Sequence, residues 1–232
     1  MSPKKPEAFP DMPMGHSPAK PRQAPRRVPW VSYAYMAVCI ALFSLSTFLG
    51  FGPHERWIQE FGLFLPAIQD GQWWRMFTCH FLHGDIVHIS FNMFVLYSLG
   101  RGLEMHIGPG LFLWASVLGA LGTAWSSMLF GAPGSTMVGA SGVIISWAGV
   151  MLPLATRHAR KALLFWFAQI AVLSLLPGIS LAGHAGGAVA GLACGFAVLQ
   201  CARGRRGWLV WLSVLLALLC IWGARPVGDW GV

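Results

Sequence analysis

Charge is what this sequence has least of. Only 10% of its 232 residues are charged and 56% are hydrophobic, whereas a soluble globular chain carries about 25% charged residues. Too few ionised side chains are present to cover a surface that faces water. The composition therefore excludes a soluble enzyme, a disordered chain and a fibrous protein, and it predicts a small multi-pass membrane protein.

Metal-binding and disulfide patterns are also missing. The five cysteines all lie within apolar stretches, and no CxxC spacing occurs among them. The HExxH motif is absent as well, which excludes a metalloprotease that depends on it. We expect small, buried, reduced cysteines, no metal site and no cofactor.

A net charge of +8 is a common sign of nucleic-acid binding, but the distribution of the charges argues against that here. Six of the 16 Lys and Arg residues precede residue 28, and most of the others lie in short gaps between apolar runs. Basic clusters of this kind set membrane topology and attract anionic lipid. We therefore expect contact with membrane lipid and no nucleic-acid partner.

Three regions follow from the composition along the chain. Residues 1–29 contain eight prolines and no apolar periodicity, so they predict a disordered basic tail. Residues 30–202 form a core with six spans, and residues 203–232 add a seventh span and a short C-terminal tail. The chain is thus predicted to be an all-α membrane protein. The apolar segments expected to form its helices are residues 31–52, 77–100, 111–130, 140–155, 162–177, 179–202 and 208–222.

The basic residues also predict the orientation of the chain. If the N-terminal tail lies inside and the spans alternate, thirteen Lys and Arg residues lie inside and three lie outside. That asymmetry favours a cytoplasmic N-terminus. With seven spans, the C-terminus lies outside. The sequence leaves the oligomeric state open.

Ionisable side chains are costly within a membrane, so each one is a candidate functional residue. The segment 77–100 contains the pattern H-x4-H-x3-N, formed by His83, His88 and Asn92. His88 and Asn92 are four residues apart and therefore share one face of a helix. His80 and Asp85 are expected to be solvated at the mouth of this helix.

Small residues accompany the other two polar candidates. Ser141 lies in the motif GASG, between Gly139 and Gly142. His184 is followed at helical spacing by Gly187 and Gly191, a face that lets another helix approach closely.

The predicted topology brings four polar side chains to the same leaflet. His88, Asn92, Ser141 and His184 all fall in the outer part of spans that run from outside to inside. A serine beside a histidine, with further hydrogen-bond donors nearby, is what nucleophilic catalysis requires.

At these residues the sequence resembles the rhomboid family of intramembrane serine proteases, over residues 73–200. The matching features are Trp74-Arg75, the pattern H-x4-H-x3-N, Gly100 with Glu104, the GASG motif, and His184 followed by two glycines. The resemblance implies a six-helix transmembrane bundle, to which segment 208–222 adds a seventh helix. It also implies a serine endopeptidase of the bacterial inner membrane whose substrates are transmembrane proteins.

The resemblance assigns a role to each site residue. Ser141 would be the nucleophile and His184 the general base, and the Ser141 amide, His88 and Asn92 would form the oxyanion hole. Supporting roles fall to His83, Gly139, Gly142, Gly187, Gly191, Glu104, Trp74 and Arg75. Two positions depart from the family pattern, because Ile145 stands where some members have tyrosine and His106 where some have arginine.

Two other classes of protein remain open. One is a rhomboid-like protein that binds membrane clients without cleaving them; such a protein normally lacks the serine or the histidine, and both are present here. The other is a haem-binding membrane protein, which would place His83 or His88 opposite His184 and would give Ser141 no role.

Overall fold

The computed structural model describes residues 28–49, 52 and 54–223, so most of the predicted N-terminal tail and the end of the C-terminal tail lie outside the described residues. Within this part the regular elements are helices, and the remaining pairing is one isolated antiparallel bridge between Leu63 and Met137. The prediction of an all-α chain is confirmed. The helices are α1 (Trp30–Thr47), α2 (His54–Phe61), α3 (Leu65–Gln69), α4 (Arg75–Thr78), η1 (Cys79–Phe81), α5 (Ile86–Val95), η2 (Leu96–Gly100), α6 (Arg101–Ile107), α7 (Pro109–Phe130), α8 (Ser141–Leu154), α9 (Arg157–Leu173), α10 (Leu181–Ala202) and α11 (Gly207–Gly223).

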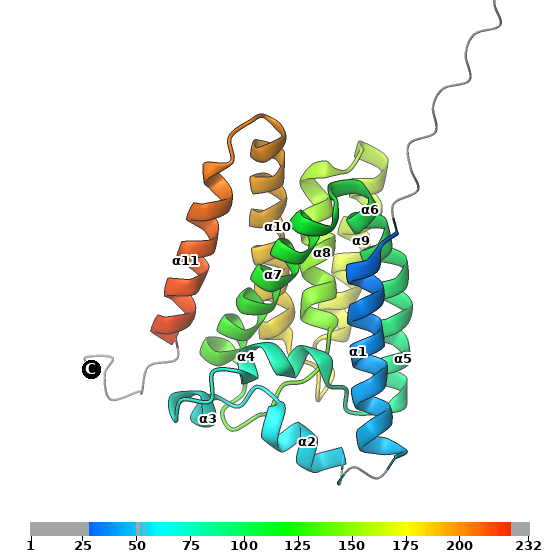
Figure 1. Ribbon diagram of the computed structural model, residues 1–232, viewed down its shortest axis with the longest axis vertical. Helices are drawn as coiled ribbons and strands as arrows, with labels where there is room; N and C mark the ends of the chain where they lie inside the picture. Colours follow the sequence, from blue (N-terminus) through cyan, green and yellow to red (C-terminus); the bar gives the residue numbers. More distant parts are fainter. Residues whose placement is uncertain (1–27, 50–51, 53, 224–232) are drawn as a thin grey trace, which may run out of the picture.

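The long helices form one bundle, and the short helices α2, α3 and α4 gather at one end of it (Figure 1). α8 starts at this same end, directly after the loop that follows α7. α11 packs beside α7 and α10, where the indole Nε1 of Trp114 donates to the hydroxyl of Ser213 at 2.9 Å. The predicted seventh helix is therefore a helix attached to the outside of the bundle.

Among the residues that the structure describes, three helices are long and apolar enough to cross a membrane, namely α1, α7 and α10. α8 and most of α11 are shorter apolar helices. α8 has only 14 residues, whereas its neighbours α7 and α10 have 22 each.

The prediction of one continuous helix over residues 77–100 is wrong at its start. The chain is extended at Leu82, and α5 begins only at Ile86. Asp85 caps α5 by accepting a 2.8 Å hydrogen bond from the His88 amide, which is the role an aspartate commonly fills at a helix start. Farther on, the helix widens into a π-turn over η2 and continues as α6 to Ile107.

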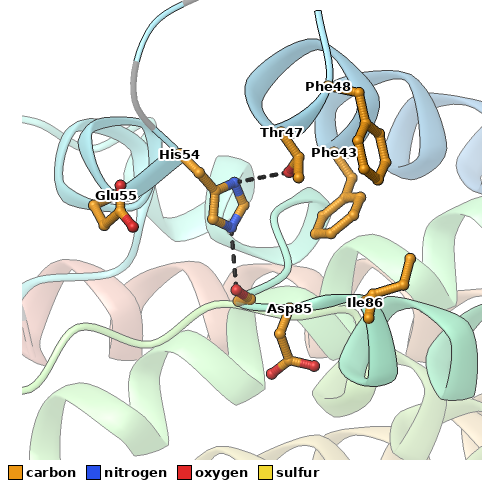
Figure 2. A pocket seen from close by; sticks show the side chains of 8 residues that line it. Phe43, Thr47, Phe48, His54, Glu55, Asp85 and Ile86 are labelled. Carbon is orange, nitrogen blue, oxygen red and sulfur yellow. Dashed lines mark hydrogen bonds between the residues drawn. The ribbon is translucent and has the colours of Figure 1, made fainter. Parts of the chain in front are cut away.

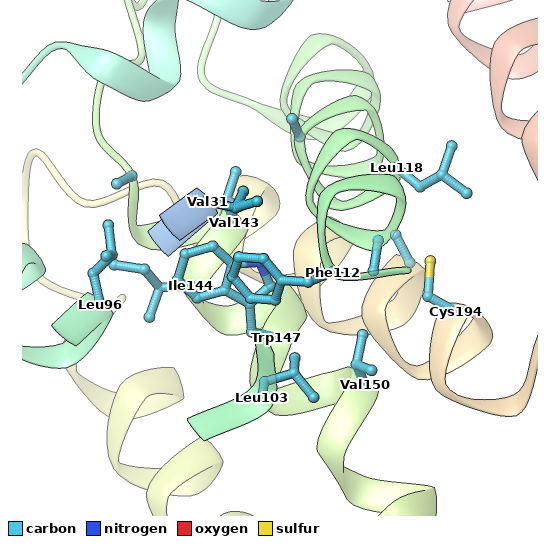
Figure 3. Packing of buried hydrophobic residues seen from close by; sticks show 14 of the residues in the cluster. Val31, Leu96, Leu103, Phe112, Leu118, Val143, Ile144, Trp147, Val150 and Cys194 are labelled. Atoms are coloured by element: carbon cyan, nitrogen blue, oxygen red, sulfur yellow. The ribbon is translucent and has the colours of Figure 1, made fainter. Parts of the chain in front are cut away.

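The core of the bundle is built around Trp147, which is fully buried in α8. Its ring lies 4.8 Å from that of Phe112 (Figure 3). Its Nε1 donates to the Ser116 hydroxyl at 2.9 Å. A Cβ atom at Gly100 would meet this indole at 2.8 Å. The π-turn η2 can therefore pack against Trp147 only because it ends in glycine.

Glycine also sets the distance between α8 and α10. A Cβ atom at Gly187, Gly191 or Gly195 of α10 would collide with main-chain carbonyl groups of α8. The colliding carbonyls belong to Gly142, Ser146 and Val150, respectively. The glycine face that the sequence predicts is therefore the face on which the two helices meet.

Candidate active site

Ser141 is the first residue of α8 and lies two positions after Gly139, whose backbone conformation only glycine adopts readily. Gly139 has φ +122°, in the region that L side chains rarely occupy. The first amides of a helix have no partner within it, so they can bind an oxygen that carries negative charge. The start of α8 thus combines a hydroxyl group with free backbone donors.

His184 lies within the first turn of α10, opposite Ser141. Ser180 caps this helix, because its hydroxyl accepts from the Gly183 amide at 3.0 Å. The Nε2 atom of His184 is 2.8 Å from the Ser141 hydroxyl oxygen, which is a hydrogen bond. The structure therefore brings the two residues together although they are 43 positions apart.

The second ring nitrogen of His184 has a partner that the sequence did not indicate. Its Nδ1 atom lies 2.6 Å from the hydroxyl of Ser174, at the C-terminal end of α9. The available signal was weak: one serine in a long apolar segment, ten residues before His184.

His88 and Asn92 approach the same place from α5. A Cβ atom at Gly139 would lie 2.7 Å from His88 Nε2, so this imidazole rests against the turn before Ser141. Asn92 is buried, and its Nδ2 atom donates to the His88 carbonyl at 2.9 Å. An amide group carries two N–H donors, so this bond leaves one for another acceptor.

His83 and His80 precede α5 and hold the loop that leads to Ser141. His83 accepts a long, 3.5 Å bond from the Ala140 amide, and its ring meets that of His88 edge-on at 5.1 Å. His80 was expected to be solvated, and that expectation is wrong. Only 1% of its surface is exposed, and its Nε2 atom donates to the Ala120 carbonyl at 3.1 Å.

Arg75 fixes the segment between α1 and α5, whereas its neighbour Trp74 is half exposed. The Nη1 atom of Arg75 donates to the Gln59 carbonyl at 2.6 Å and to the Gly62 carbonyl at 2.9 Å. The next residue, Leu63, pairs with Met137 through two 2.9 Å backbone bonds. This segment is thereby joined to the loop that precedes Ser141.

His54 provides another link that sequence reasoning missed (Figure 2). Its Nδ1 atom bonds the hydroxyl of Ser46 at 2.9 Å, and its Nε2 atom bonds the Gly84 carbonyl at 3.2 Å. The imidazole therefore joins the end of α1 to the turn from which α5 begins.

Glu104 lies at the opposite end of the bundle, away from Ser141. Its carboxylate accepts from the Val31 amide at 3.0 Å, from the Ser32 amide at 2.8 Å and from the Ser32 hydroxyl at 2.7 Å. These bonds satisfy free amides at the start of α1 and tie that helix to α6. His106, two residues after Glu104, is exposed, whereas Ile145, four residues after Ser141, is buried in α8.

The described part of the chain contains no group of three or more His, Cys, Asp or Glu side chains that could hold a metal ion. What it does contain is a membrane-type helical bundle in which a serine hydroxyl bonds a histidine beside backbone and side-chain donors. Such an arrangement is suited to acyl transfer, in which the histidine accepts the serine proton and the donors bind the oxyanion.

Comparisons with known proteins identify the family. A family model described as the Rhomboid domain matches residues 70–201. Rhomboid protease GluP of Bacillus subtilis (strain 168) is 28% identical over 202 residues, which is 83% of this chain and 39% of that protein. RHOMBOID-like protein 2 of Arabidopsis thaliana is 33% identical over 172 residues, covering 68% of this chain and 52% of the relative. Rhomboid protease GlpG of Serratia proteamaculans (strain 568) is 29% identical over 174 residues, covering 69% and 60%.

The match to the family model covers more than half of the chain, so this protein belongs to the rhomboid family. It is an integral membrane protein, and two of these three relatives are named as proteases. The chain spans between 39% and 60% of the length of these relatives.

The burial of His80 predicts a loss of stability when its ring is removed. The imidazole is 1% exposed and bonds the Ala120 carbonyl of α7. His80→Ala leaves that carbonyl without its partner and opens a cavity, so the free energy of unfolding should fall by about 3 kcal/mol.

Reversible unfolding in mixed detergent would measure this effect. His158→Ala, at an exposed position on α9, should leave the free energy of unfolding nearly unchanged. An equal free energy of unfolding in the wild type and His80→Ala would contradict the prediction.

Proposed function

We propose that this protein is an intramembrane serine endopeptidase, in which Ser141 and His184 hydrolyse peptide bonds in or next to transmembrane segments of other proteins. The observation that carries the proposal is the 2.8 Å contact between His184 Nε2 and the Ser141 hydroxyl. The names of the related proteases support the reaction class. Membrane-embedded substrates fit a bundle whose exterior is largely apolar.

The proposed reaction begins when the Ser141 oxygen attacks the scissile carbonyl and its proton passes to His184 Nε2. The carbonyl oxygen becomes an oxyanion, for which we propose the Ser141 amide, His88 and the second N–H of Asn92 as hydrogen-bond donors. The intermediate collapses as His184 returns the proton to the leaving amine. Water then cleaves the acyl-enzyme by the same route, with His184 again acting as the base.

The orientation that we propose places the N-terminal end in the cytoplasm and Ser141 toward the outer face of a bacterial inner membrane. The excess of basic residues on one side supports it. In Figure 1, α11 ends at the end of the bundle where α2–α4 lie, whereas α1 begins at the opposite end. Seven traverses of the chain are consistent with this arrangement.

The nucleophile can be tested by removing one hydroxyl. Ser141→Ala should abolish cleavage of a transmembrane model substrate in proteoliposomes and should abolish labelling by a fluorophosphonate probe. Ser146→Ala removes a buried hydroxyl from the same helix, where it bonds only the Val143 carbonyl, and should keep both signals. Full cleavage by Ser141→Ala would refute the proposal, and binding without cleavage by the wild type would indicate a client-binding protein.

The oxyanion hole can be tested at Asn92. Its donor acts on charge that develops only in the transition state, so Asn92→Ala should lower kcat and leave KM nearly unchanged. A loss of up to about 100-fold is expected, since the Ser141 amide and His88 remain. Initial rates over a range of substrate concentrations separate the two constants. A change confined to KM would assign Asn92 to packing or substrate binding instead.

The orientation can be tested with a reporter fused to the chain. A fusion after Trp222 should report the outer side of the membrane, because α11 then completes a seventh crossing. A fusion after Gly204, in the turn between α10 and α11, should report the cytoplasm. If both fusions lie in the cytoplasm, α11 does not span and the chain has six crossings.

A further inference from the structure

Ser174 is exceptional in its part of the chain. It is 4% exposed, and it is the one buried residue between residues 157 and 179, whereas α9 itself has no buried residue. Its hydroxyl makes two short contacts of 2.6 Å, one to the Ile170 carbonyl and one to His184 Nδ1. The single side chain that this region buries therefore contacts the histidine that faces Ser141.

The two contacts fix the direction of the hydrogen bond to His184. A hydroxyl has one proton, and a carbonyl oxygen can only accept. If Ser174 gave its proton to Nδ1, its oxygen would face the Ile170 oxygen at 2.6 Å with no proton between them, which is repulsive. The hydroxyl proton therefore points at Ile170, and His184 Nδ1 is the donor to Ser174.

The direction of that bond determines which tautomer His184 adopts. A neutral imidazole carries one N–H, and the partner of one nitrogen decides the state of the other. A proton held on Nδ1 leaves Nε2 with its lone pair, and Nε2 is the atom 2.8 Å from the Ser141 hydroxyl. This is the form of histidine that can accept a proton from serine.

We propose that Ser174 is a positioning residue that holds the proton of His184 on Nδ1, so that Nε2 faces Ser141 as a base. The inference rests on the proposed function. The Ser141 proton moves to Nε2 during attack, while the Nδ1 proton stays in its bond to Ser174. No proton passes through Ser174, which accepts one hydrogen bond before, during and after the transfer.

The bond also joins α9 and α10, two helices that otherwise contact each other little. His184 is carried by α10, which is packed tightly against α8, and Ser174 ends α9. Six residues that form no helix connect Ser174 to Leu181. The Ser174 hydroxyl therefore orients the imidazole from outside the helix pair that supplies the other reacting groups.

The kinetic test compares two variants of nearly equal shape. Ser174→Thr keeps the hydroxyl and should retain kcat close to the wild type, whereas Ser174→Val should lower kcat about tenfold, the worth of one neutral hydrogen bond. KM should change little in either variant. Ser98→Ala removes a hydroxyl that bonds the Phe94 carbonyl four residues before it, as Ser174 bonds Ile170, but it does not touch His184 and should have no effect. Equal kcat values for Thr and Val would overturn the proposal.

A spectroscopic test does not depend on activity or on how a branched side chain fits. In protein labelled with ¹⁵N-histidine, the one-bond ¹⁵N–¹H coupling shows which nitrogen carries the proton, and His184→Gln assigns the signal. The wild type should carry it on Nδ1, and Ser174→Ala should show an increased share on Nε2. A proton on Nε2 in the wild type, or no change in Ser174→Ala, would overturn the proposal. If Ser141→Ala still cleaves substrate, the proposed function fails instead, and the tautomer result stands apart from it.

Discussion

The close approach of α8 and α10 is the constraint on which the rest of the site depends. Gly187, Gly191 and Gly195 leave no room for a Cβ atom, because the backbone of α8 occupies that space. Ser141 and His184 lie at one end of this seam. A hydrogen bond weakens when its donor and acceptor move apart by a few tenths of an ångström. A methyl group at any of these glycines would push α8 and α10 apart and lengthen the 2.8 Å contact between Ser141 and His184.

The segment between α1 and α5 serves the same contact from the other direction. Arg75 holds its fold through two backbone carbonyls, and the bridge between Leu63 and Met137 fastens it to the loop before α8. The Gly139 amide donates to the Cys79 carbonyl at 2.9 Å, which fixes the turn at Gly139 itself. The short helices of this segment therefore help to position Ser141, in addition to covering one end of the bundle.

Local spacing in the sequence was enough to predict a large part of this arrangement. The four-residue intervals from Gly187 onward predict a close helix contact, and the interval between His88 and Asn92 predicts a shared face; the structure has both. The GASG motif at the start of an apolar segment predicts a serine at the beginning of a helix, and α8 begins at Ser141.

Features that depend on distant partners could not be predicted in the same way. His80 is buried against α7, where it bonds the Ala120 carbonyl forty residues away. No pattern in the sequence around His80 indicates this contact. The contact between Ser174 and His184 crosses from one helix to the next through a segment without periodicity. The break before α5 is a different case, because its signal is local. Gly84 and Asp85 interrupt an apolar run only briefly, so hydropathy predicts one continuous helix, whereas Asp85 is a capping residue that predicts a helix start.

The length of α8 has a consequence for hydration. At 1.5 Å per residue its 14 residues extend about 21 Å, against about 33 Å for α7 and α10 and about 30 Å for the hydrocarbon layer of a bilayer. Residues 131–140 make up the difference without a helix, and their backbone groups cannot be left in contact with lipid tails. Protein or water must therefore surround the backbone of this loop, so the shortness of one helix excludes lipid tails from the level just above Ser141.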